Sequence, residues 1–469
     1  MNSQNETCGI IEDLIPLYAE NLCSEESRAA VEAHLQHCER CRKLADALPA
    51  ALPVPAEAVP DEAKTFRKVN RFMTKNRRLN LVLILLLALI LLGLGLLTVG
   101  QIDKSLGIPS FESIKHCDIK EADGVAWAFV NKEKMVQFPF KFTGIAPDEV
   151  RVNVLYAGLC QSDVHTVRQV WGPCKYPMAP GHEIIGEVSL VGKDVKDFKK
   201  GEIVGFGTMR DCCEKCKFCK KGKENLCREG PDNFTYGEHW GGYATAMQQP
   251  ARFYFHLPDG FKIEKAAPLF CAGITTYYPM EKFLTDNMKT TGVIGCGGLG
   301  HMAIQFLHKM GKHVTAFTTS EKKKELLQKL GADKIVISTD PEQMKAAKNS
   351  IEFLINTVPN DIDFEQYIAC VERGGKFIQV GMPAVNDSLK INVNNFVCNE
   401  VEIIGSIVGP RQPINKMVDF CHKNDVYPIV EEYPFEEMPK AFEKLENGRP
   451  HFRCVVNMKD YAEKNGLKK

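Results

Sequence analysis

The segment TTGVIGCGGLGHMAIQFLHKMGKHVTAF, residues 290–317, reads as an apolar strand, a glycine-rich turn, an amphipathic helix and a second apolar strand. Glycines in the turn permit a sharp bend and let a pyrophosphate approach the amino end of the helix. A glycine motif alone is weak evidence, but here a strand and a helix flank it in the required order. The segment therefore predicts a dinucleotide site, whose turn is formed by Gly295, Gly297, Gly298, Leu299 and Gly300.

The residues after the second strand bear on which nicotinamide cofactor binds. An NAD site usually ends this strand in a carboxylate that binds the ribose 2′-hydroxyl. This chain instead has hydroxyl groups followed by cations, namely Thr318, Thr319, Ser320, Lys322 and Lys323. Hydroxyls and cations suit a 2′-phosphate, so the sequence predicts NADP(H). The one nearby carboxylate, Glu321, is interpreted as a solvent-facing residue at the start of the next helix.

The pattern of apolar and polar residues on either side of this segment indicates the fold class. Strands and helices keep alternating after residue 290, as in EKKKELLQKLGAD and KIVIS, which favours a parallel sheet with crossover helices. From about residue 110, short apolar runs such as VRVNVLYAG and EIIGEVSLVG predict a β-rich part. The 469 residues exceed the roughly 250–300 that one hydrophobic core organises. We therefore expect an α/β protein of several domains.

The composition excludes some partners and favours others. Lysine plus arginine equals aspartate plus glutamate at 59 each, so there is no net field to attract nucleic acid. The 18 cysteines lie largely at short gaps beside histidines. This pattern favours metal binding in a reducing compartment over a disulfide framework.

The run CEKCKFCKKGKENLC is the most specific motif. It supplies Cys213, Cys216, Cys219 and Cys227, four thiolates that can surround one Zn²⁺ tetrahedrally with no open position. Two-residue gaps seldom permit disulfide geometry, although chance clustering stays open as an alternative. The adjacent Cys212 is interpreted as a spectator.

A second set of metal-binding side chains is dispersed along the chain. GLCQSDVH contains Cys160, Ser162, Asp163 and His165; PGHEIIG contains His182 and Glu183; LFCAG contains Cys271. Two thiolates and one imidazole would leave the fourth position of a zinc ion for water or substrate. Any one of these residues alone is more often a buried cysteine or a histidine whose hydrogen bonds are satisfied. The prediction therefore depends on all of them occurring in one chain.

These motifs, in this order, resemble those of the zinc-containing medium-chain dehydrogenases, and among them the cinnamyl-alcohol-dehydrogenase-like group. The runs KYPMAPGHEIIGEV, WGGYATAM, GCGGLGHMAIQ, VTAFTTSEKKKELL and IIGSIVG also look like that group. The resemblance implies a GroES-like catalytic domain at 110–270, a Rossmann domain at 271–408 and a return to the catalytic domain at 409–469. It also implies interconversion of primary alcohols and aldehydes with NADP(H), and a homodimer.

The resemblance assigns roles to individual residues. Cys160, His182 and Cys271 would hold a catalytic zinc, with Glu183 able to approach it. Asp163 would fix the tautomer of His182, and Ser162 with His165 would relay a proton to solvent. Gly405 and Ser406 would border the nicotinamide. For Trp171 and Trp240 two interpretations stay open: each could line an apolar substrate cleft or pack in the core.

The N-terminal hundred residues have a different character. LVLILLLALILLGLGLLTV, residues 81–99, is uncharged and long enough to span a bilayer, so it predicts a transmembrane helix at 80–100. A proline- and alanine-rich linker followed by a basic stretch precedes it at 49–79. By the positive-inside rule the N-terminus would be cytoplasmic and the protein a single-pass membrane protein.

The pattern of residues 1–48 predicts a helical domain with its own candidate metal site. Cys8, His34, Cys38 and Cys41 include an H-x3-C-x2-C spacing and would complete a closed tetrahedral zinc site. They resemble the zinc-binding anti-sigma-factor domain, which implies a sigma factor as partner. A helix with scattered cysteines is the alternative.

These predictions conflict, because a cytoplasmic N-terminus would place the dehydrogenase outside, where thiolates oxidise. Either the helix inserts the other way, or it does not insert, or two unrelated coding regions have been joined, and we favour the last. The rival function is a membrane-tethered anti-sigma-type transcription regulator with a non-catalytic dehydrogenase-like sensor.

Overall fold

The computed structural model describes residues 25–46, 114–229, 232–233, 240–359, 362–383, 391–448 and 450–467, together with Ile11, Ile15 and Tyr18. The chain divides into two units, residues 1–99 and 100–469, which are described separately. In the first unit, helix α2 (Glu25–His37) is followed by α3 (Glu39–Asp46). Their buried side chains, among them Val31 and Cys41, form a small apolar cluster with Ile11 and Ile15.

The expected parallel sheet is present in the second unit. Its strand order is β13-β12-β11-β14-β15-β16, and every pairing is parallel. The strands are β11 (Thr290–Ile294), β12 (His313–Thr318), β13 (Lys334–Ile337), β14 (Ile351–Asn356), β15 (Val371–Gln379) and β16 (Glu402–Gly405). This is the doubly wound order of a Rossmann sheet, in which the order of successive strands along the sheet reverses between β11 and β14. Ligands of such sheets bind at that reversal.

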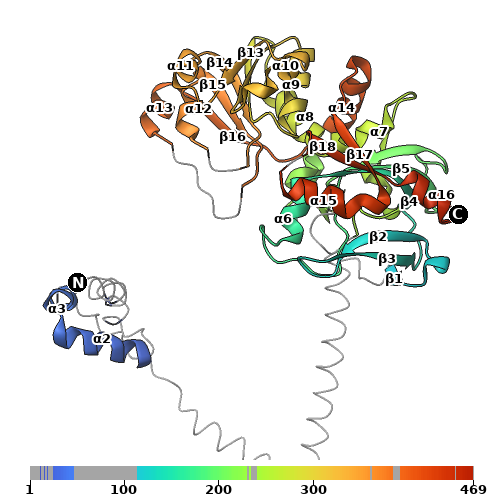
Figure 1. Cartoon of the computed structure of the whole chain (residues 1–469), viewed down its shortest axis with the longest axis horizontal. Coiled ribbons are helices and arrows are strands. Elements are labelled where there is room, and N and C mark those ends of the chain that lie inside the picture. The colour runs from blue at the N-terminus through green and yellow to red at the C-terminus, as the bar shows by residue number, and fades with distance from the viewer. Residues whose placement is uncertain are drawn as a thin grey trace, which may run out of the picture. The chain divides into compact units, whose positions relative to one another are not determined.

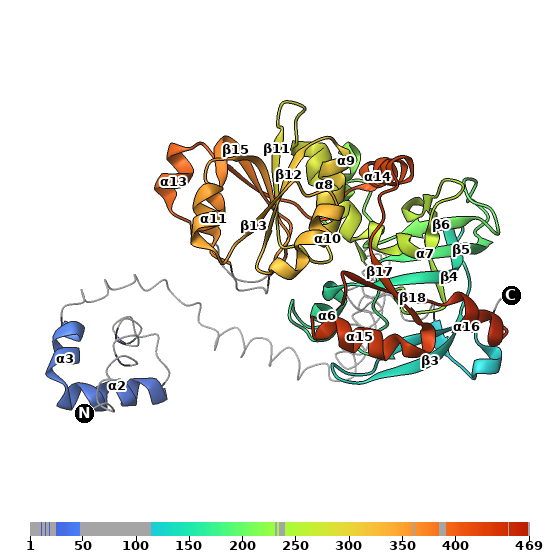
Figure 2. The same ribbon diagram turned by 45° about the horizontal axis from the view of Figure 1, so that its top comes forward.

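Helices cover this sheet, as Figures 1 and 2 show. They are α9 (Gly300–Lys309), α10 (Lys324–Lys329), α11 (Pro341–Ala346), α12 (Phe364–Ile368) and α13 (Val393–Cys398). Helices α8 (Ala272–Phe283) and α14 (Arg411–Asn424) pack against each other beside α9. The apolar face of α9 is fully buried at Met302, Phe306 and Leu307, which confirms the amphipathic helix predicted after the glycine turn.

The β-rich part contains a second large sheet, of order β10-β6-β5-β4-β18-β17, with β9 paired to β4. Its strands are β4 (Glu149–Leu159), β5 (Ile184–Val191), β6 (Ile203–Phe206), β9 (Ala246–Pro250), β10 (Phe255–His256), β17 (Val430–Pro434) and β18 (Arg453–Asn457). Strand β18 pairs antiparallel with β4, across almost 300 residues of sequence. The chain therefore returns to this sheet after completing the Rossmann domain.

Smaller elements surround the second sheet. A three-stranded sheet contains β1 (Ile114–His116), β2 (Gly124–Phe129) and β3 (Met135–Phe142), and β7 (Met209–Asp211) pairs with β8 (Asp232–Asn233). The helices are α6 (Gln161–Val167), α7 (Ile263–Ala266), α15 (Met438–Glu446) and α16 (Lys459–Lys464). Together these two parts give the expected fold class, a β-rich part joined to a doubly wound parallel sheet with crossover helices.

Among the helices in the ranges given above, none is long and apolar enough to cross a bilayer. The longest, α14, has 14 residues and measures roughly 21 Å, short of the roughly 30 Å hydrocarbon core. This finding contradicts the single-pass membrane localisation predicted from the sequence, and that prediction is wrong. The expected span at 81–99 and the segment 49–79 lie outside the described residues.

Candidate active site

Three separate segments meet at the edge of the β-rich sheet. Cys160 follows directly on β4, and His182 and Glu183 directly precede β5. Because β4 and β5 are antiparallel neighbours, with Ala157 opposite Ile184, the end of one strand lies beside the start of the other. Cys271 precedes α8, so each side chain is positioned by the end of a regular element.

Tight packing fixes the position of the third segment. A Cβ at Gly205 would lie 1.9 Å from Cζ of Phe270, and one at Gly207 would lie 2.3 Å from the carbonyl oxygen of Phe270. Only glycine allows β6 and the turn after it to approach the chain this closely. The residue after Phe270 is Cys271, which is therefore held against the sheet.

The predicted ligand atoms converge. One ligand atom from each of Cys160, His182, Glu183 and Cys271 lies within 4.8 Å of the others, and all four residues are buried. The two sulfurs are 3.9 Å apart, and Nε2 of His182 is 3.2 Å from Sγ of Cys271. The hydrogen bond from Cys271 lowers the pKa of the Cys160 thiol, although burial acts in the other direction. Two sulfurs, an imidazole and a carboxylate form a donor set that fits zinc.

Asp163 contacts this cluster through hydrogen bonds to His182 and to the backbone of Cys160. Its carboxylate is 2.9 Å from Nδ1 of His182 and accepts hydrogen bonds from the backbone N–H groups of Gly181 and Cys160. The hydroxyl of Tyr243 donates a further bond at 3.1 Å. With Nδ1–H donated to Asp163, the lone pair of Nε2 faces the sulfurs, as a metal-binding histidine requires.

Glu183 has a partner that sequence reasoning missed. Its Oε1 forms an ion pair with the guanidinium of Arg453, which is 4 % exposed and begins β18. Burial raises the pKa of Glu183 to about 7, while Arg453 opposes the shift. The other oxygen, Oε2, has no hydrogen-bond partner, so it is free to approach a cation. No motif marks Arg453 in the sequence, because only the pairing of β18 with β4 brings it here.

The four-cysteine set also comes together, with Cys213, Cys216, Cys219 and Cys227 offering sulfurs within 4.8 Å of one another. Backbone N–H groups of Cys216 and Cys219 point at the sulfurs of Cys213 and Cys216, at 3.3 and 3.5 Å. Such bonds stabilise thiolates, which fits a closed metal site. Cys212 packs with Met209 and Phe253 in the neighbouring apolar cluster.

In the N-terminal unit, His34, Cys38 and Cys41 likewise lie within 4.8 Å of one another. His34 lies in the last turn of α2, Cys38 lies between the two helices, and Cys41 lies in the first turn of α3. An imidazole and two sulfurs supply three of the four ligands of a tetrahedral zinc. The fourth predicted ligand, Cys8, lies outside the described residues.

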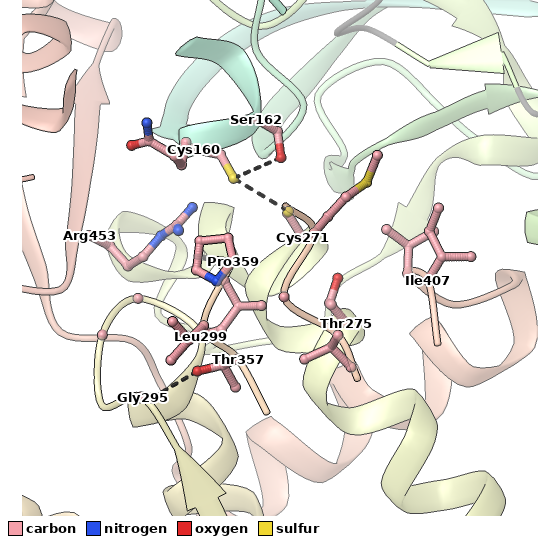
Figure 3. A pocket seen from close by; sticks show the side chains of 18 of the residues that line it. Cys160, Ser162, Cys271, Thr275, Gly295, Leu299, Thr357, Pro359, Ile407 and Arg453 are labelled. Carbon is pink, nitrogen blue, oxygen red and sulfur yellow. Dashed lines mark hydrogen bonds between the residues drawn. The ribbon is translucent and has the colours of Figure 1, made fainter. Parts of the chain in front are cut away.

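A cleft of about 1130 Å³ joins the metal cluster to the glycine turn. Cys160, His182 and Cys271 line it from the β-rich part, and Gly295, Leu299 and Thr357 line it from the Rossmann part. Figure 3 shows Cys160 and Cys271 facing each other above Leu299 and Gly295. Ligands bound by the turn and by the cluster would therefore share one cavity.

The expected proton-relay residues and one of the two tryptophans also face the cleft. Ser162 and His165 line it, and the Ser162 hydroxyl is 3.6 Å from Sγ of Cys160. Burial lowers the pKa of His165, which keeps the ring neutral. Trp171 lines the cleft and packs on His165 with ring centroids 5.0 Å apart. Trp240 instead packs on phenylalanines of β3, so of the two interpretations of Trp240 the structure supports packing.

The glycine turn has room on one side only. A Cβ at Gly300 would lie 1.8 Å from the carbonyl oxygen of Gly295, whereas a Cβ at Gly297 would meet no atom within 4 Å. Gly295 itself has φ +82°, which disfavours other residues. Gly300 thus closes the turn, and Gly297 faces the open space of the cleft.

The other predicted cofactor residues fall into two groups, those that line the cleft and those that do not. Gly298, Lys322, Lys323, Gly405 and Ser406 line the cleft, whereas Gly300, Thr318, Thr319 and Ser320 are not among its lining residues. The hydroxyl of Thr318 accepts a bond from the backbone of Ser320, and Lys323 donates to the carbonyl of Cys296. Of this group, the two lysines therefore face the cleft.

His301, next to the turn, is a buried link that the sequence reasoning did not single out. Its Nδ1 is 3.2 Å from the carbonyl oxygen of Gly297, and its Nε2 accepts a bond from the backbone N–H of Ile429. Its ring stacks on Phe452. Burial lowers the pKa of His301 to about 3, so the ring stays neutral and joins the turn to the returning chain.

Three family models match the chain. Residues 146–259 match the alcohol dehydrogenase GroES-like domain, residues 298–423 match the zinc-binding dehydrogenase family, and residues 8–42 match a family described as "Putative zinc-finger". The two dehydrogenase matches cover the β-rich and Rossmann parts. The third covers the N-terminal cluster, as predicted.

Relatives and solved structures extend this likeness over the second unit. A probable cinnamyl alcohol dehydrogenase 1 of Oryza sativa subsp. japonica is 37% identical over 344 residues, which is 71% of this chain and 96% of the relative. An 8-hydroxygeraniol dehydrogenase of Catharanthus roseus is 39% identical, over 68% of this chain and 91% of the relative. The crystal structure of CAD from Helicobacter pylori complexed with NADP(H) superposes with a TM-score of 0.66 and 32% identity, covering 72% of this chain and 98% of that one.

Proposed function

This chain belongs to the zinc-containing medium-chain alcohol dehydrogenases, and from that premise we propose that it reduces aldehydes to primary alcohols with NADPH, and reverses the reaction with NADP⁺. The observation that supports the proposal is the shared cleft, in which Cys160, His182 and Cys271 face the glycine turn. A regulator that only bound a ligand would not need both a metal cluster and a dinucleotide turn in one cavity.

We infer that the chain holds two zinc ions in this unit. Cys160, His182 and Cys271 would hold one, with the free Oε2 of Glu183 within reach of it. Cys213, Cys216, Cys219 and Cys227 would hold the other in a closed structural site. When bound, the first ion polarises a carbonyl oxygen, and the nicotinamide supplies the hydride. Asp163 keeps Nε2 of His182 aimed at the metal position.

The side chains around the cluster provide the proton. The hydroxyl of Ser162 lies next to Sγ of Cys160, where it can donate to an oxygen at the metal position. His165 faces the same cleft with a neutral ring, so it can replace that proton from the solvent side. The indole of Trp171, packed on His165, limits water in this region and presents an apolar surface to the substrate.

NADP(H) is the proposed cofactor because Lys322 and Lys323 line the cleft beyond the second strand of the sheet. Two ammonium groups there suit a 2′-phosphate, and the backbone N–H groups of the turn suit the pyrophosphate. The bound cofactor named for the Helicobacter pylori structure agrees with this choice. Titration of the purified chain with both reduced cofactors tests it: tighter binding of NADH than of NADPH would exclude the proposal.

Turnover of benzaldehyde-type and aliphatic aldehydes with NADPH tests the function itself. We expect Cys160→Ala to abolish turnover and to leave NADPH affinity nearly unchanged, because the thiol belongs to the metal set and not to the turn. Cys370→Ala is the matched control, since Cys370 is also fully buried but lies outside the metal sets. Unchanged turnover in Cys160→Ala would refute the metal assignment, and a wild-type chain inactive on the whole panel would refute the function.

For the N-terminal unit we propose a third zinc, held by His34, Cys38, Cys41 and Cys8. The clustering of His34, Cys38 and Cys41 and the zinc-finger match over residues 8–42 support it. Zinc quantification should give three ions per chain and two in Cys38→Ser; an unchanged count would exclude this site. Binding of a sigma factor and assembly into a homodimer stay predictions, and the regulator alternative is not favoured by the relatives.

A further inference from the structure

The loop that contains the four cysteines also reaches the substrate cleft. Between Cys219 and Cys227 the chain forms a short 3-10 helix, Glu224–Leu226, and two of its residues line the cleft. The segment 405–411, which joins β16 to α14, contributes residues 405–408 to the same cleft. Two stretches some 180 residues apart in sequence therefore meet in one wall.

Two buried side chains of the loop hold that segment. Glu224 is 3 % exposed, and its carboxylate accepts bonds from Nε of Arg411 at 2.9 Å and from the backbone N–H of Arg411 at 3.4 Å. Asn225 donates from Nδ2 to the carbonyl oxygen of Ile407 at 3.0 Å. We call these contacts, Glu224–Arg411 and Asn225–Ile407, the cysteine-loop tether.

The tethered segment needs external support. Val408 has φ +26°, a backbone conformation that a β-branched residue rarely adopts. The side chain of Ile407 is half exposed, so core packing does not fix it. Such strained backbone persists only where its surroundings over-determine it. The cysteine-loop tether contacts the chain at Ile407 and at Arg411, which lie on both sides of Val408.

We propose that Glu224 and Asn225 are positioning residues, through which the four-cysteine loop fixes the cleft wall at 405–408 and so sets the geometry of hydride transfer. The proposal rests on the proposed function, since residues 405 and 406 are those expected to border the nicotinamide. Neither side chain touches the reacting atoms in this scheme. The loop would thereby couple a structural metal site to the active cleft by contact alone.

Hydrogen exchange and kinetics of matched variants test the tether. Glu224→Gln removes the charge at nearly constant shape. Glu281→Gln is the control, because it breaks the ion pair of Glu281 with Lys416, which stands on the same helix α14, without touching the cysteine loop. In Glu224→Gln we expect the amides of 405–411 to exchange at least about tenfold faster, and kcat to fall at least about tenfold, since small displacements of reacting groups are costly. Zinc content and NADPH affinity should stay within about twofold of wild type.

A double-mutant comparison separates the tether from general damage. Arg411→Gln removes the side-chain part of the same contact, so the double variant should lose little more than Glu224→Gln alone. Equal exchange and equal kcat in Glu224→Gln and Glu281→Gln would overturn the proposal, as would loss of zinc in Glu224→Gln. A wild-type chain without turnover would count against the proposed function, whereas the exchange comparison would still decide the tether.

Discussion

The cofactor turn allows the same substitution to be made at two glycines with opposite expected results. In Gly300→Ala the new Cβ would lie 1.8 Å from the carbonyl oxygen of Gly295, whereas real Cβ contacts are at least 3.0 Å. The two backbones must therefore separate by more than 1 Å, at a cost of about 3 kcal/mol by comparison with overpacked cores. For a unit of this size we expect Tm to fall by about 5 °C or more. In Gly297→Ala the Cβ meets no atom within 4 Å, so Tm should be unchanged to within about 1 °C.

Cofactor binding should show a different pattern from stability. If the pyrophosphate lies over the turn, the Cβ of Gly297→Ala occupies its space, and Kd for NADPH should rise at least about tenfold, or about 1.4 kcal/mol. Thermal unfolding and fluorescence titration of both variants measure the two effects separately. Wild-type affinity in Gly297→Ala would refute the placement of the pyrophosphate, and wild-type stability in Gly300→Ala would refute the packing argument.

Three further predictions concern the groups around the cleft. Asp163→Asn should weaken zinc binding about 10- to 100-fold, because the amide cannot hold His182 as the carboxylate does; chelator competition measures this, and an unchanged affinity would contradict the role of Asp163. His301→Gln should change the pH dependence of unfolding: burial lowers the pKa of His301 to about 3, so its contribution is complete above about pH 6.5 and is lost as pH falls, by up to about 1.4 kcal/mol per pH unit. The variant should lack that slope in urea unfolding between about pH 6.5 and 5, and identical slopes would refute the assignment. Cys219→Ser should lower the zinc content by one ion and lower Tm, since the lysine-rich loop has little core of its own; unchanged zinc by elemental analysis would remove the structural site.

Local patterns predicted much of the fold and the candidate site. The glycine turn sits between a strand and a helix because each part is specified within about 20 residues, and the same holds for the four-cysteine run. The dispersed ligands were found because cysteine and histidine stand out where a strand ends or begins. These are features that a single stretch of sequence contains.

What the sequence could not predict depends on contacts between distant segments. Arg453 reaches Glu183 only through the pairing of β18 with β4, and His301 reaches Ile429 only through the returning chain. Whether the hydroxyls at 318–320 bind a 2′-phosphate stays a prediction, because their orientation depends on local turns and not on residue type alone. The tether of Glu224 to Arg411 likewise has no local signature.

The pairing of β18 with β4 also has a consequence for biosynthesis. Strand β18, which begins at Arg453, is made long after β4, so residues Tyr156–Leu159 of β4 have no partner strand on that side until then. During this interval the nucleotide-binding half can fold by itself as an inserted unit, because its strands pair only with one another. Non-local pairing of this kind slows folding and leaves a strand edge exposed to other chains. A premature stop before residue 453 would therefore yield a chain with an intact dinucleotide turn, an open sheet edge and a strong tendency to aggregate.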